Sequence, residues 1–216
     1  MIHIQSFTFN AFSENTYILF DETREAVIID PGCYDKRERD ALTGFVEQNQ
    51  LKPVKLLITH AHVDHVLGNA FVKRHYGIEL YLHESDLPVL KSVKVLAPHY
   101  GMAAYEEAEV DQFLVAGEIV TFGHSKLEVR FVPGHAPGHV AFISHADRFV
   151  MGGDVLFRGS VGRTDFPLSD FDTLVTSIRT QLYTLPDDYT VYPGHMGTTT
   201  IGQEKRSNPF VRPANG

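Results

Sequence analysis

The sequence predicts an α/β fold in which two β-sheets pack face to face and helices cover their outer faces. The 216 residues divide into two similar halves, each with several strand-like runs followed by a helical pattern. Histidines and aspartates stand directly after several predicted strands, as they do where a sheet builds a site along one edge. Hydrophobic residues at 43% and charged residues at 21% are ordinary for a globular chain. One domain over residues 1–216 is therefore expected, with a short C-terminal helical extension.

The first half consists of apolar or alternating runs bounded by turn residues. Asp35 can cap the first helix, and Glu38 three residues later completes a capping box. Gly77 ends the second helix, because glycine readily adopts the left-handed conformation found there. The expected elements, in order, are strands at 2–9, 16–20 and 25–30, a helix at 36–48, a strand at 54–59, a helix at 65–76 and a strand at 79–82.

Residues 84–115 are less regular, and we expect them to form an insert over the site. Two prolines and a glycine interrupt this segment and leave room for two short helical patches. Three of its side chains could line a lid, although ordinary packing is the favoured interpretation; they are His99, Tyr100 and Tyr105.

The second half repeats the plan loosely. Ser169 and Asp170 can cap its long helix, and Thr200 with Gln203 predicts the start of a short C-terminal helix. The expected elements are strands at 118–122, 126–132, 138–144 and 148–151, a helix at 171–182 and a strand at 190–192.

The most informative stretch is residues 59–65, with the sequence THAHVDH, which directly follows an apolar run. If the chain stays extended, the side chains of three of the four donors in this stretch point to the same side of the chain, and that of the fourth points elsewhere. The segment can therefore supply two metal centres, because imidazole and carboxylate bind zinc, iron and manganese. The alternative is a polar turn with scattered surface histidines. The three donors that share a side are His60, His62 and Asp64, and the last donor is His65.

Three further donors complete this set and argue against a simple polar turn. His135 lies in PGHAPGH at 133–139, Asp154 ends MGGD at 151–154, and His195 ends VYPGH at 191–195. Each follows a predicted strand and stands beside glycine, which lets the backbone turn sharply and approach a ligand closely.

These motifs, with Asp30 in VIIDPG at 27–32, resemble the metallo-β-lactamase superfamily from about residue 10 to residue 210. The resemblance implies a four-layer αββα sandwich, the metallo-β-lactamase fold. Asp30 is expected in a supporting role, orienting a ligand or holding its loop, and His139 is expected to pack beside the ligands because the set of seven is already full. By the same resemblance, one metal ion is bound by His60, His62 and His135, and a second by Asp64, His65 and His195, with Asp154 bridging the two.

Such a site would be hydrolytic. Two divalent transition-metal ions held roughly 3.5–4 Å apart can share a water and convert it to hydroxide near neutral pH. Zinc is the first expectation, with iron or manganese as alternatives. Asp64 and Asp154 are the expected catalytic carboxylates, and Asp154 stays ionised because it lies between two cations. The chemistry suits an ester, thioester, amide or phosphodiester, and the ligand set does not choose among them.

Two finer motifs resemble the glyoxalase II group, the hydroxyacylglutathione hydrolases: GSVGRTDF at 159–166 and GQEKRSNPF at 202–210. In that group a basic residue at the position of Arg163 contacts the glutathione part of the substrate, whereas the structural alternative here is a salt bridge with Asp165. Longer members carry a C-terminal helical domain that is mostly missing here, so the chain resembles the short bacterial variety and a broader thioesterase activity stays open. Weaker substrate-binding candidates are Arg158, Lys205 and Arg206.

Two rival functions remain. The segment at 162–166 is shared with the persulfide dioxygenases of the superfamily, which bind a single iron through two histidines and one aspartate. The complete second donor set favours a dinuclear hydrolase over this oxidoreductase. A non-catalytic binding module would be expected to have lost a ligand, and every ligand of the set is present.

The composition of the chain limits the classes of binding partner that are expected. A net charge of −8 argues against a nucleic-acid or membrane-surface role, so the expected partner is a small molecule, a glutathione thioester by the resemblance, bound by a monomer or homodimer. Cys33 is the single cysteine and is expected to be a small buried thiol. The N-terminal residues alternate like a strand, and no apolar run reaches the length of a membrane span, so a cytoplasmic location is expected.

Overall fold

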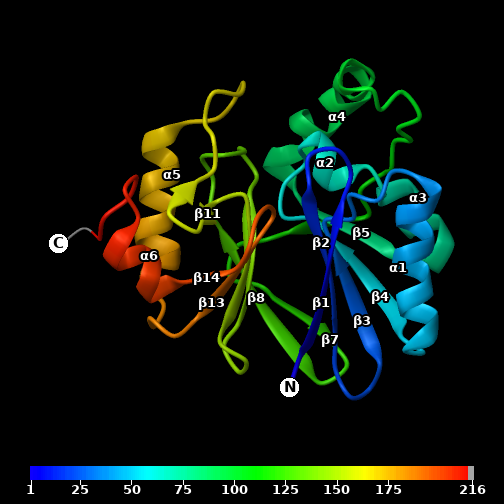
Figure 1. Ribbon diagram of the computed structural model, residues 1–216, viewed down its shortest axis with the longest axis horizontal. Helices are drawn as coiled ribbons and strands as arrows, with labels where there is room; N and C mark the ends of the chain where they lie inside the picture. The colour runs from blue at the N-terminus through cyan, green and yellow to red at the C-terminus, as the bar shows by residue number, and fades with distance from the viewer. Residues whose placement is uncertain (214–216) are drawn as a thin grey trace.

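Two six-stranded sheets pack face to face in the computed structural model, which describes residues 1–213 (Figure 1). Helices cover the outer face of each sheet, so the layers run helix, sheet, sheet, helix. The four-layer αββα sandwich expected from the sequence is confirmed.

The first sheet follows the chain in order. Its first three strands pair antiparallel, and the rest are added in parallel. The strands are β1 (His3–Phe9), β2 (Glu14–Phe20), β3 (Glu25–Ile29), β4 (Lys52–Leu57), β5 (Glu79–His83) and β6 (Gln112–Leu114).

The second sheet has the order β14-β13-β10-β9-β8-β7, and only its β10–β13 pair is parallel. A separate hairpin joins β11 (Leu156–Phe157) to β12 (Ser160–Val161). The six strands are β7 (Ile119–Phe122), β8 (Ser125–Phe131), β9 (Val140–Ser144), β10 (Phe149–Gly153), β13 (Thr190–Pro193) and β14 (Thr199–Thr200).

Helices α1 (Lys36–Gln48) and α3 (Asn69–Tyr76) lie outside the first sheet, and α5 (Phe171–Ser177) and α6 (Ile201–Ser207) lie outside the second (Figure 1). The segment between β5 and β6 carries a 3₁₀ turn at Glu84–Asp86, helix α4 (Leu87–Leu96) and a second 3₁₀ turn at Ala97–Tyr100. No helix among residues 1–213 is long and apolar enough to cross a membrane.

Three apolar clusters hold the layers together. Between the sheets, side chains such as Leu57 of β4 pack against Phe142 of β9. A second cluster fills the space between the first sheet and its helices, and a third, around Leu174 and Ile178, joins the second sheet to α5. Burial of this apolar area is the main contribution that holds the two sheets and their helices together.

The capping box of α1 is confirmed: the Asp35 carboxylate accepts from the backbone N–H of Glu38, and the Glu38 carboxylate accepts from that of Asp35. Gly77 ends α3 in the left-handed conformation, as predicted. The helix at 171–182 has the predicted extent, but residues Ile178–Leu182 form a π-helical turn.

The single helix predicted at 65–76 is wrong. The chain instead forms a short α2 (Val63–Val66), breaks, and restarts as α3. The N–H of Gly68 donates to the Pro31 carbonyl (2.7 Å), and the Asp64 carbonyl accepts from the side-chain amide of Asn10 (3.0 Å). Tertiary partners therefore take both groups of the hydrogen bond that would have continued the helix.

Candidate metal centre

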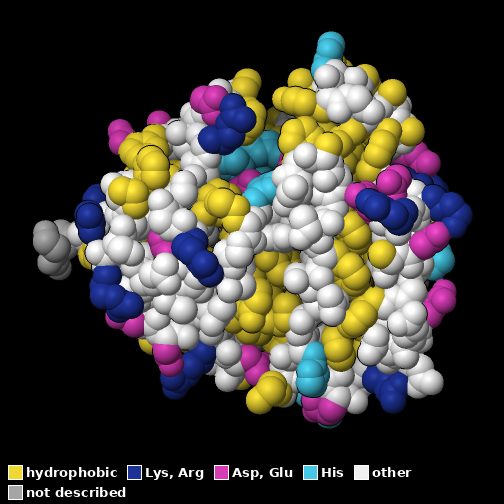
Figure 2. Space-filling model, in the orientation of Figure 1, with side chains coloured by type: hydrophobic (Ala, Val, Ile, Leu, Met, Phe, Trp, Pro, Cys, Tyr) yellow, Lys and Arg dark blue, Asp and Glu magenta, His cyan; other side chains and the backbone are white. Residues whose placement is uncertain are grey.

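All seven predicted donors lie on the same edge of the sandwich, five in loops that follow strands and two, Asp64 and His65, in the short helix α2. His60 and His62 follow β4, His135 lies between β8 and β9, Asp154 follows β10, and His195 follows β13. Figure 2 shows histidine side chains at the bottom of a hollow between the two helical layers. Residues up to 135 positions apart in the sequence thus meet at one edge of the two sheets.

The first donor cluster consists of His60, His62 and His135, whose ligand nitrogens lie within 4.8 Å of one another. Nδ1 of His62 is 2.9 Å from Nε2 of His135. The three imidazoles stand nearly perpendicular to one another, with interplanar angles of 75° to 84°. Their nitrogens therefore converge on one point from different directions.

The second donor cluster consists of Asp64, His65 and His195, also within 4.8 Å. Nε2 of His195 is 3.1 Å from Oδ2 of Asp64, and Nε2 of His65 is 3.7 Å from the same oxygen. Asp64 and His65 lie side by side in the short helix α2, so the break after this helix helps to place both donors.

Asp154 reaches both clusters. Its Oδ2 is 3.6 Å from Nε2 of His135 in the first cluster and 3.4 Å from Nε2 of His195 in the second. Its Oδ1 is 3.5 Å from Nε2 of His65. A single carboxylate between two groups of donors has the position of a bridging ligand.

In His135 and His195 the imidazole nitrogen that faces away from the clusters has a partner. Nδ1 of His135 donates to the Arg163 carbonyl (2.7 Å), and Nδ1 of His195 is 3.2 Å from the Phe12 carbonyl. A carbonyl can only accept, so these imidazoles carry a proton on Nδ1 and face the clusters with Nε2.

Asp30 is linked by hydrogen bonds to an imidazole of each cluster, directly to His65 and through Thr59 to His60. Its backbone has a positive φ of 48°, and its buried carboxylate accepts from the Thr59 N–H (2.7 Å), the Thr59 hydroxyl (2.5 Å) and Nδ1 of His65 (3.2 Å). Since the Thr59 hydroxyl donates to Asp30, it is free to accept from Nδ1 of His60 at 3.1 Å. One carboxylate thus orients an imidazole in each cluster.

His139 lies beside the clusters and belongs to neither. Its ring stacks on His60 with centroids 4.6 Å apart, and its Nε2 accepts from the backbone N–H of Asp154 (3.0 Å). The contacts are those of a packed residue that holds the backbone of the bridging position.

The electrostatics of the polypeptide alone differ between the clusters. In the first, burial and neighbouring imidazoles hold the pKa of His60 well below its ordinary value and lower that of His62 to about 3. In the second, burial opposes protonation of His195, but hydrogen bonds to Asp154 and Asp64 raise its pKa to about 9. Protons therefore balance the carboxylates in the second cluster, a role that a bound cation can take over.

These residues fit a metal site. Three buried polar atoms at its centre have no hydrogen-bond partner among residues 1–213: His60 Nε2, His65 Nε2 and Asp154 Oδ1. Buried polar groups are almost always paired, and cations satisfy such atoms. The mixed nitrogen and oxygen donors suit zinc, iron or manganese.

The basic candidates for substrate binding are placed differently. The Arg163 guanidinium is exposed, lies 4.3 Å from the centroid of Phe166, and forms two bonds of 2.6 Å to Asp165. The salt bridge with Asp165, which was the structural alternative to substrate contact for Arg163, is therefore present. Arg158 donates to the Thr198 carbonyl.

The remaining basic candidates are on α6. Lys205 donates to the Leu185 carbonyl (2.8 Å) and to Asp187 (2.9 Å), and Arg206 lies 3.7 Å from the same carboxylate. These contacts attach α6 to the loop before β13. They give both basic side chains a structural role that requires no ligand.

The three residues that could line a lid differ in their surroundings. Tyr100 is exposed and meets the Phe12 ring edge-on at 5.4 Å, so the insert reaches the loop whose carbonyl binds His195. Tyr105 instead packs against the core under the insert, and His99 is exposed. Cys33 is a buried free thiol, as expected, and burial raises its pKa to about 12.

Three buried acids were absent from the sequence-based expectations. Glu14 accepts from the Thr16 hydroxyl (2.9 Å), and Glu204 accepts from the backbone of Gly159 (2.9 Å). Burial raises the pKa of Asp86 to about 6, against the effect of two backbone hydrogen bonds. Glu204 stands in the quoted tail motif, and Asp86 follows β5 as the ligands follow their strands, so position after a strand was the available signal for Asp86.

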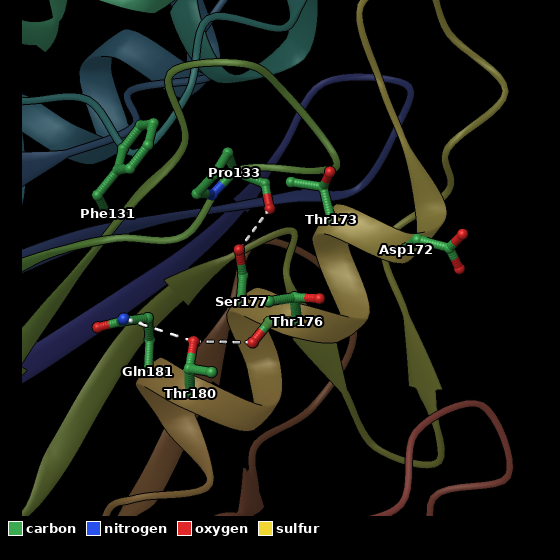
Figure 3. A pocket seen from close by; sticks show the side chains of 8 residues that line it. All are labelled: Phe131, Pro133, Asp172, Thr173, Thr176, Ser177, Thr180 and Gln181. Atoms are coloured by element: carbon green, nitrogen blue, oxygen red, sulfur yellow. Dashed lines mark hydrogen bonds between the residues drawn. The ribbon is translucent and has the colours of Figure 1, made fainter. Parts of the chain in front are cut away.

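A separate depression lies between α5 with the turn that follows it and the end of β8 (Figure 3). Its hydroxyls bond to the protein itself: Ser177 donates to the Pro133 carbonyl and Thr180 to that of Thr176. None of the residues that line it belongs to either donor cluster, so the chemistry belongs to the strand ends.

Residues 10–195 match the sequence profile of the metallo-beta-lactamase superfamily. The chain belongs to this superfamily. It is 40% identical over 212 residues to the Hydroxyacylglutathione hydrolase GloC of Haemophilus influenzae, which covers 97% of this chain and 98% of that protein. The protein is therefore a metal-dependent hydrolase, and the superfamily uses a dinuclear metal site.

The chain is also similar to solved structures over nearly its whole length. The BLEG-1 B3 metallo-beta-lactamase has a TM-score of 0.88 and 32% identity over 97% of this chain and 99% of its own. TTHA1623 in a di-iron-bound form has a TM-score of 0.85 and 37% identity, covering 96% and 100%. ETHE1 from Myxococcus xanthus has a TM-score of 0.79 and 26% identity, covering 96% and 83%.

Proposed function

We propose that this protein is a thioesterase that hydrolyses hydroxyacylglutathione thioesters such as S-lactoylglutathione. The observation that carries the proposal is its 40% identity to a hydroxyacylglutathione hydrolase over nearly the whole of both chains. The donor clusters support it, because metal-assisted hydrolysis requires no serine or cysteine nucleophile, and the single cysteine is buried and keeps its proton.

In this proposal each donor cluster would hold one divalent transition-metal ion, and Asp154 is placed to bind both. When bound, such ions supply Lewis-acid polarisation of a carbonyl and activation of a water. Asp64 and Asp154 are the carboxylates nearest the reacting atoms, while Asp30 and His139 hold ligand side chains and backbone in place. Zinc remains the first expectation, and the di-iron form of TTHA1623 supports iron as well. The proposed ligands are His60, His62 and His135 for the first ion, and Asp64, His65 and His195 for the second.

Arg163 is the proposed contact for a substrate carboxylate. The ring of Phe166, on which its guanidinium lies, is 4.8 Å from the ring of His62, so the guanidinium stands one side chain away from the first cluster. A guanidinium pairs well with a carboxylate, and a substrate carboxylate would exchange with Asp165 at this exposed position. Arg158 and Lys205 take no part in the proposal, because backbone carbonyls already engage them.

The second candidate function is a mononuclear iron persulfide dioxygenase. The similarity to the ETHE1 structure gives it some support, less than GloC gives to the hydrolase. The complete second donor cluster favours two ions. A small-molecule partner, a monomeric or homodimeric state and a cytoplasmic location stay predictions.

One experiment separates the two functions. Purified protein with measured metal content is assayed on S-lactoylglutathione, other glutathione thioesters and coenzyme A thioesters, and for oxygen uptake with glutathione persulfide. Thiol release that is greatest with S-lactoylglutathione supports the proposal. Oxygen consumption with one iron per chain and no thioester hydrolysis would establish the dioxygenase instead.

A further inference from the structure

Asp86 is a fully buried carboxylate outside the seven donors. It ends the 3₁₀ turn Glu84–Asp86 after β5. Its Oδ2 accepts from the backbone N–H of Ala61 (2.5 Å), and its Oδ1 accepts from the backbone N–H of Gly138 (2.7 Å). Both oxygens are therefore used, and both by the main chain.

The two loops that Asp86 joins come from different sheets. Ala61 lies between His60 and His62 after β4 of the first sheet, and Gly138 lies in the loop of His135 before β9 of the second. This one side chain thus bonds to the backbone on both sides of the first donor cluster. The nearby backbone bond from Val140 to the Thr59 carbonyl (2.8 Å) joins the same loops but lies outside the ligand segments.

The sequence is adapted to this contact. A Cβ on Gly138 would lie 2.4 Å from the backbone nitrogen of Asp86, a distance that real Cβ atoms do not adopt. Glycine at this position lets the loop of His135 approach the 3₁₀ turn closely enough for the hydrogen bond. Hydrogen bonds to an ionised carboxylate are stronger than those between neutral groups. The two hydrogen bonds of Asp86 are also buried, where water does not compete with them.

We propose that Asp86 is a positioning residue of the first metal site, whose carboxylate sets the spacing between the loop of His60 and His62 and the loop of His135. The inference rests on the proposed metal binding but on no particular substrate. Asp86 bonds to none of the residues of the second cluster, so its effect falls on the first ion. Loss of it lets the imidazoles that converge on that ion spread apart.

Asp21 offers a matched control. Its carboxylate is also buried and also accepts two backbone N–H groups, that of Thr23 in its own turn (3.0 Å) and that of His124 in the hairpin loop after β7 (2.8 Å). It lies after the far end of β2, and Glu14 at the near end pairs with His195. Replacing it removes contacts of the same kind at the opposite edge of the sandwich from the donors, together with hydrogen bonds from the hydroxyls of Thr23 and Ser125.

The test measures metal binding directly. Metal-free wild-type, Asp86→Ala, Asp86→Asn and Asp21→Asn proteins are titrated with Co²⁺, with visible absorption and competition against a chromophoric chelator as readouts. Thermal unfolding of each metal-free protein gives its stability. We expect Asp86→Ala to bind the first ion about 10- to 100-fold more weakly with an altered ligand-field spectrum, and Asp86→Asn to fall between it and wild type because one acceptor remains.

The control separates positioning from stability. Asp21→Asn should lose thermal stability yet keep the wild-type affinity and spectrum. Wild-type cobalt binding in both Asp86 variants would overturn the inference, and so would an equal loss of affinity in Asp21→Asn. If Asp86→Ala does not fold, Asp86→Asn alone decides through the same spectrum. Wild-type protein that binds no cobalt would overturn the proposed metal site itself, which is a different result.

Discussion

The backbone carbonyl of Arg163 accepts a hydrogen bond of 2.7 Å from Nδ1 of His135. The same residue therefore orients a donor of the first cluster through its main chain and presents a guanidinium to solvent through its side chain. Substitutions that change only the side chain leave the carbonyl in place. Substrate recognition and metal binding can thus be tested separately at this position.

Replacing Arg163 by alanine should raise KM for S-lactoylglutathione about tenfold and change kcat less. A charge-assisted hydrogen bond remote from the reacting carbonyl is expected to stabilise the ground state and the transition state alike. Small thioesters that lack the peptide carboxylates should be hydrolysed almost as before. Steady-state kinetics on both substrates, with metal content measured, provides the check, and equal losses on both would make Arg163 structural.

Asp165→Asn should act in the opposite direction. Asp165 holds the Arg163 guanidinium through two bonds of 2.6 Å and would compete with a substrate carboxylate. Removing its charge while keeping its size should lower KM for S-lactoylglutathione. An increase in KM would show that the ion pair holds Arg163 in its working position.

Metal stoichiometry should reach two ions per chain under metal-replete conditions. His60→Ala should empty the first site, because the His60 imidazole is one of only three nitrogens that converge there, whereas His195→Ala should mainly weaken the second. Elemental analysis of the dialysed proteins measures this directly. Wild-type activity with no more than one ion per chain would contradict the dinuclear arrangement.

Asp154→Asn should reduce turnover by about a hundredfold or more, roughly the effect of losing one key electrostatic stabiliser. The amide keeps the size of the carboxylate but removes the negative charge that reaches both clusters. Asp165→Asn, an acid-to-amide change at the surface, is the control for kcat. Near-normal turnover in Asp154→Asn would mean that Asp154 does not bridge.

Asp21 should contribute stability that depends on pH. Burial opposes its ionisation, but hydrogen bonds from Thr23, Ser125 and His124 lower its pKa to about 2 from 3.8. The folded-state pKa lies below the unfolded one, so the contribution, about 2 kcal/mol, is complete above about pH 4 and is lost as the pH falls toward 2. Urea unfolding of metal-free wild type and Asp21→Asn at pH 7 and pH 3 should show the difference shrinking at the lower pH. A difference that does not change with pH would exclude this role.

Much of the fold could be predicted from the sequence, because its signals are local. The capping box of Asp35 and Glu38, the glycine after α3 and the alternating strands each depend on residues a few positions apart. The donors were also identifiable, since they come soon after strands and three of them stand beside a glycine. Their grouping into two sites came from the family resemblance, and their roles as ligands, like the single-domain organisation, stay predictions.

Other features were decided only by the tertiary structure. The break between α2 and α3 depends on Pro31 and Asn10, which take the hydrogen bonds of a continuous helix. Strand β6 has three residues and forms only because β5 lies beside it, which no short apolar pattern could reveal.

The same is true of the side chains around the site. Lys205 meets Asp187 and a backbone carbonyl across 18 and 20 positions, and Asp86 meets Gly138 across 52 positions. Residue type and periodicity show which face of an element is buried and which residues can bind a metal. They do not show which buried acid meets which distant N–H, because that pairing exists only after the two sheets have packed and brought their loops together.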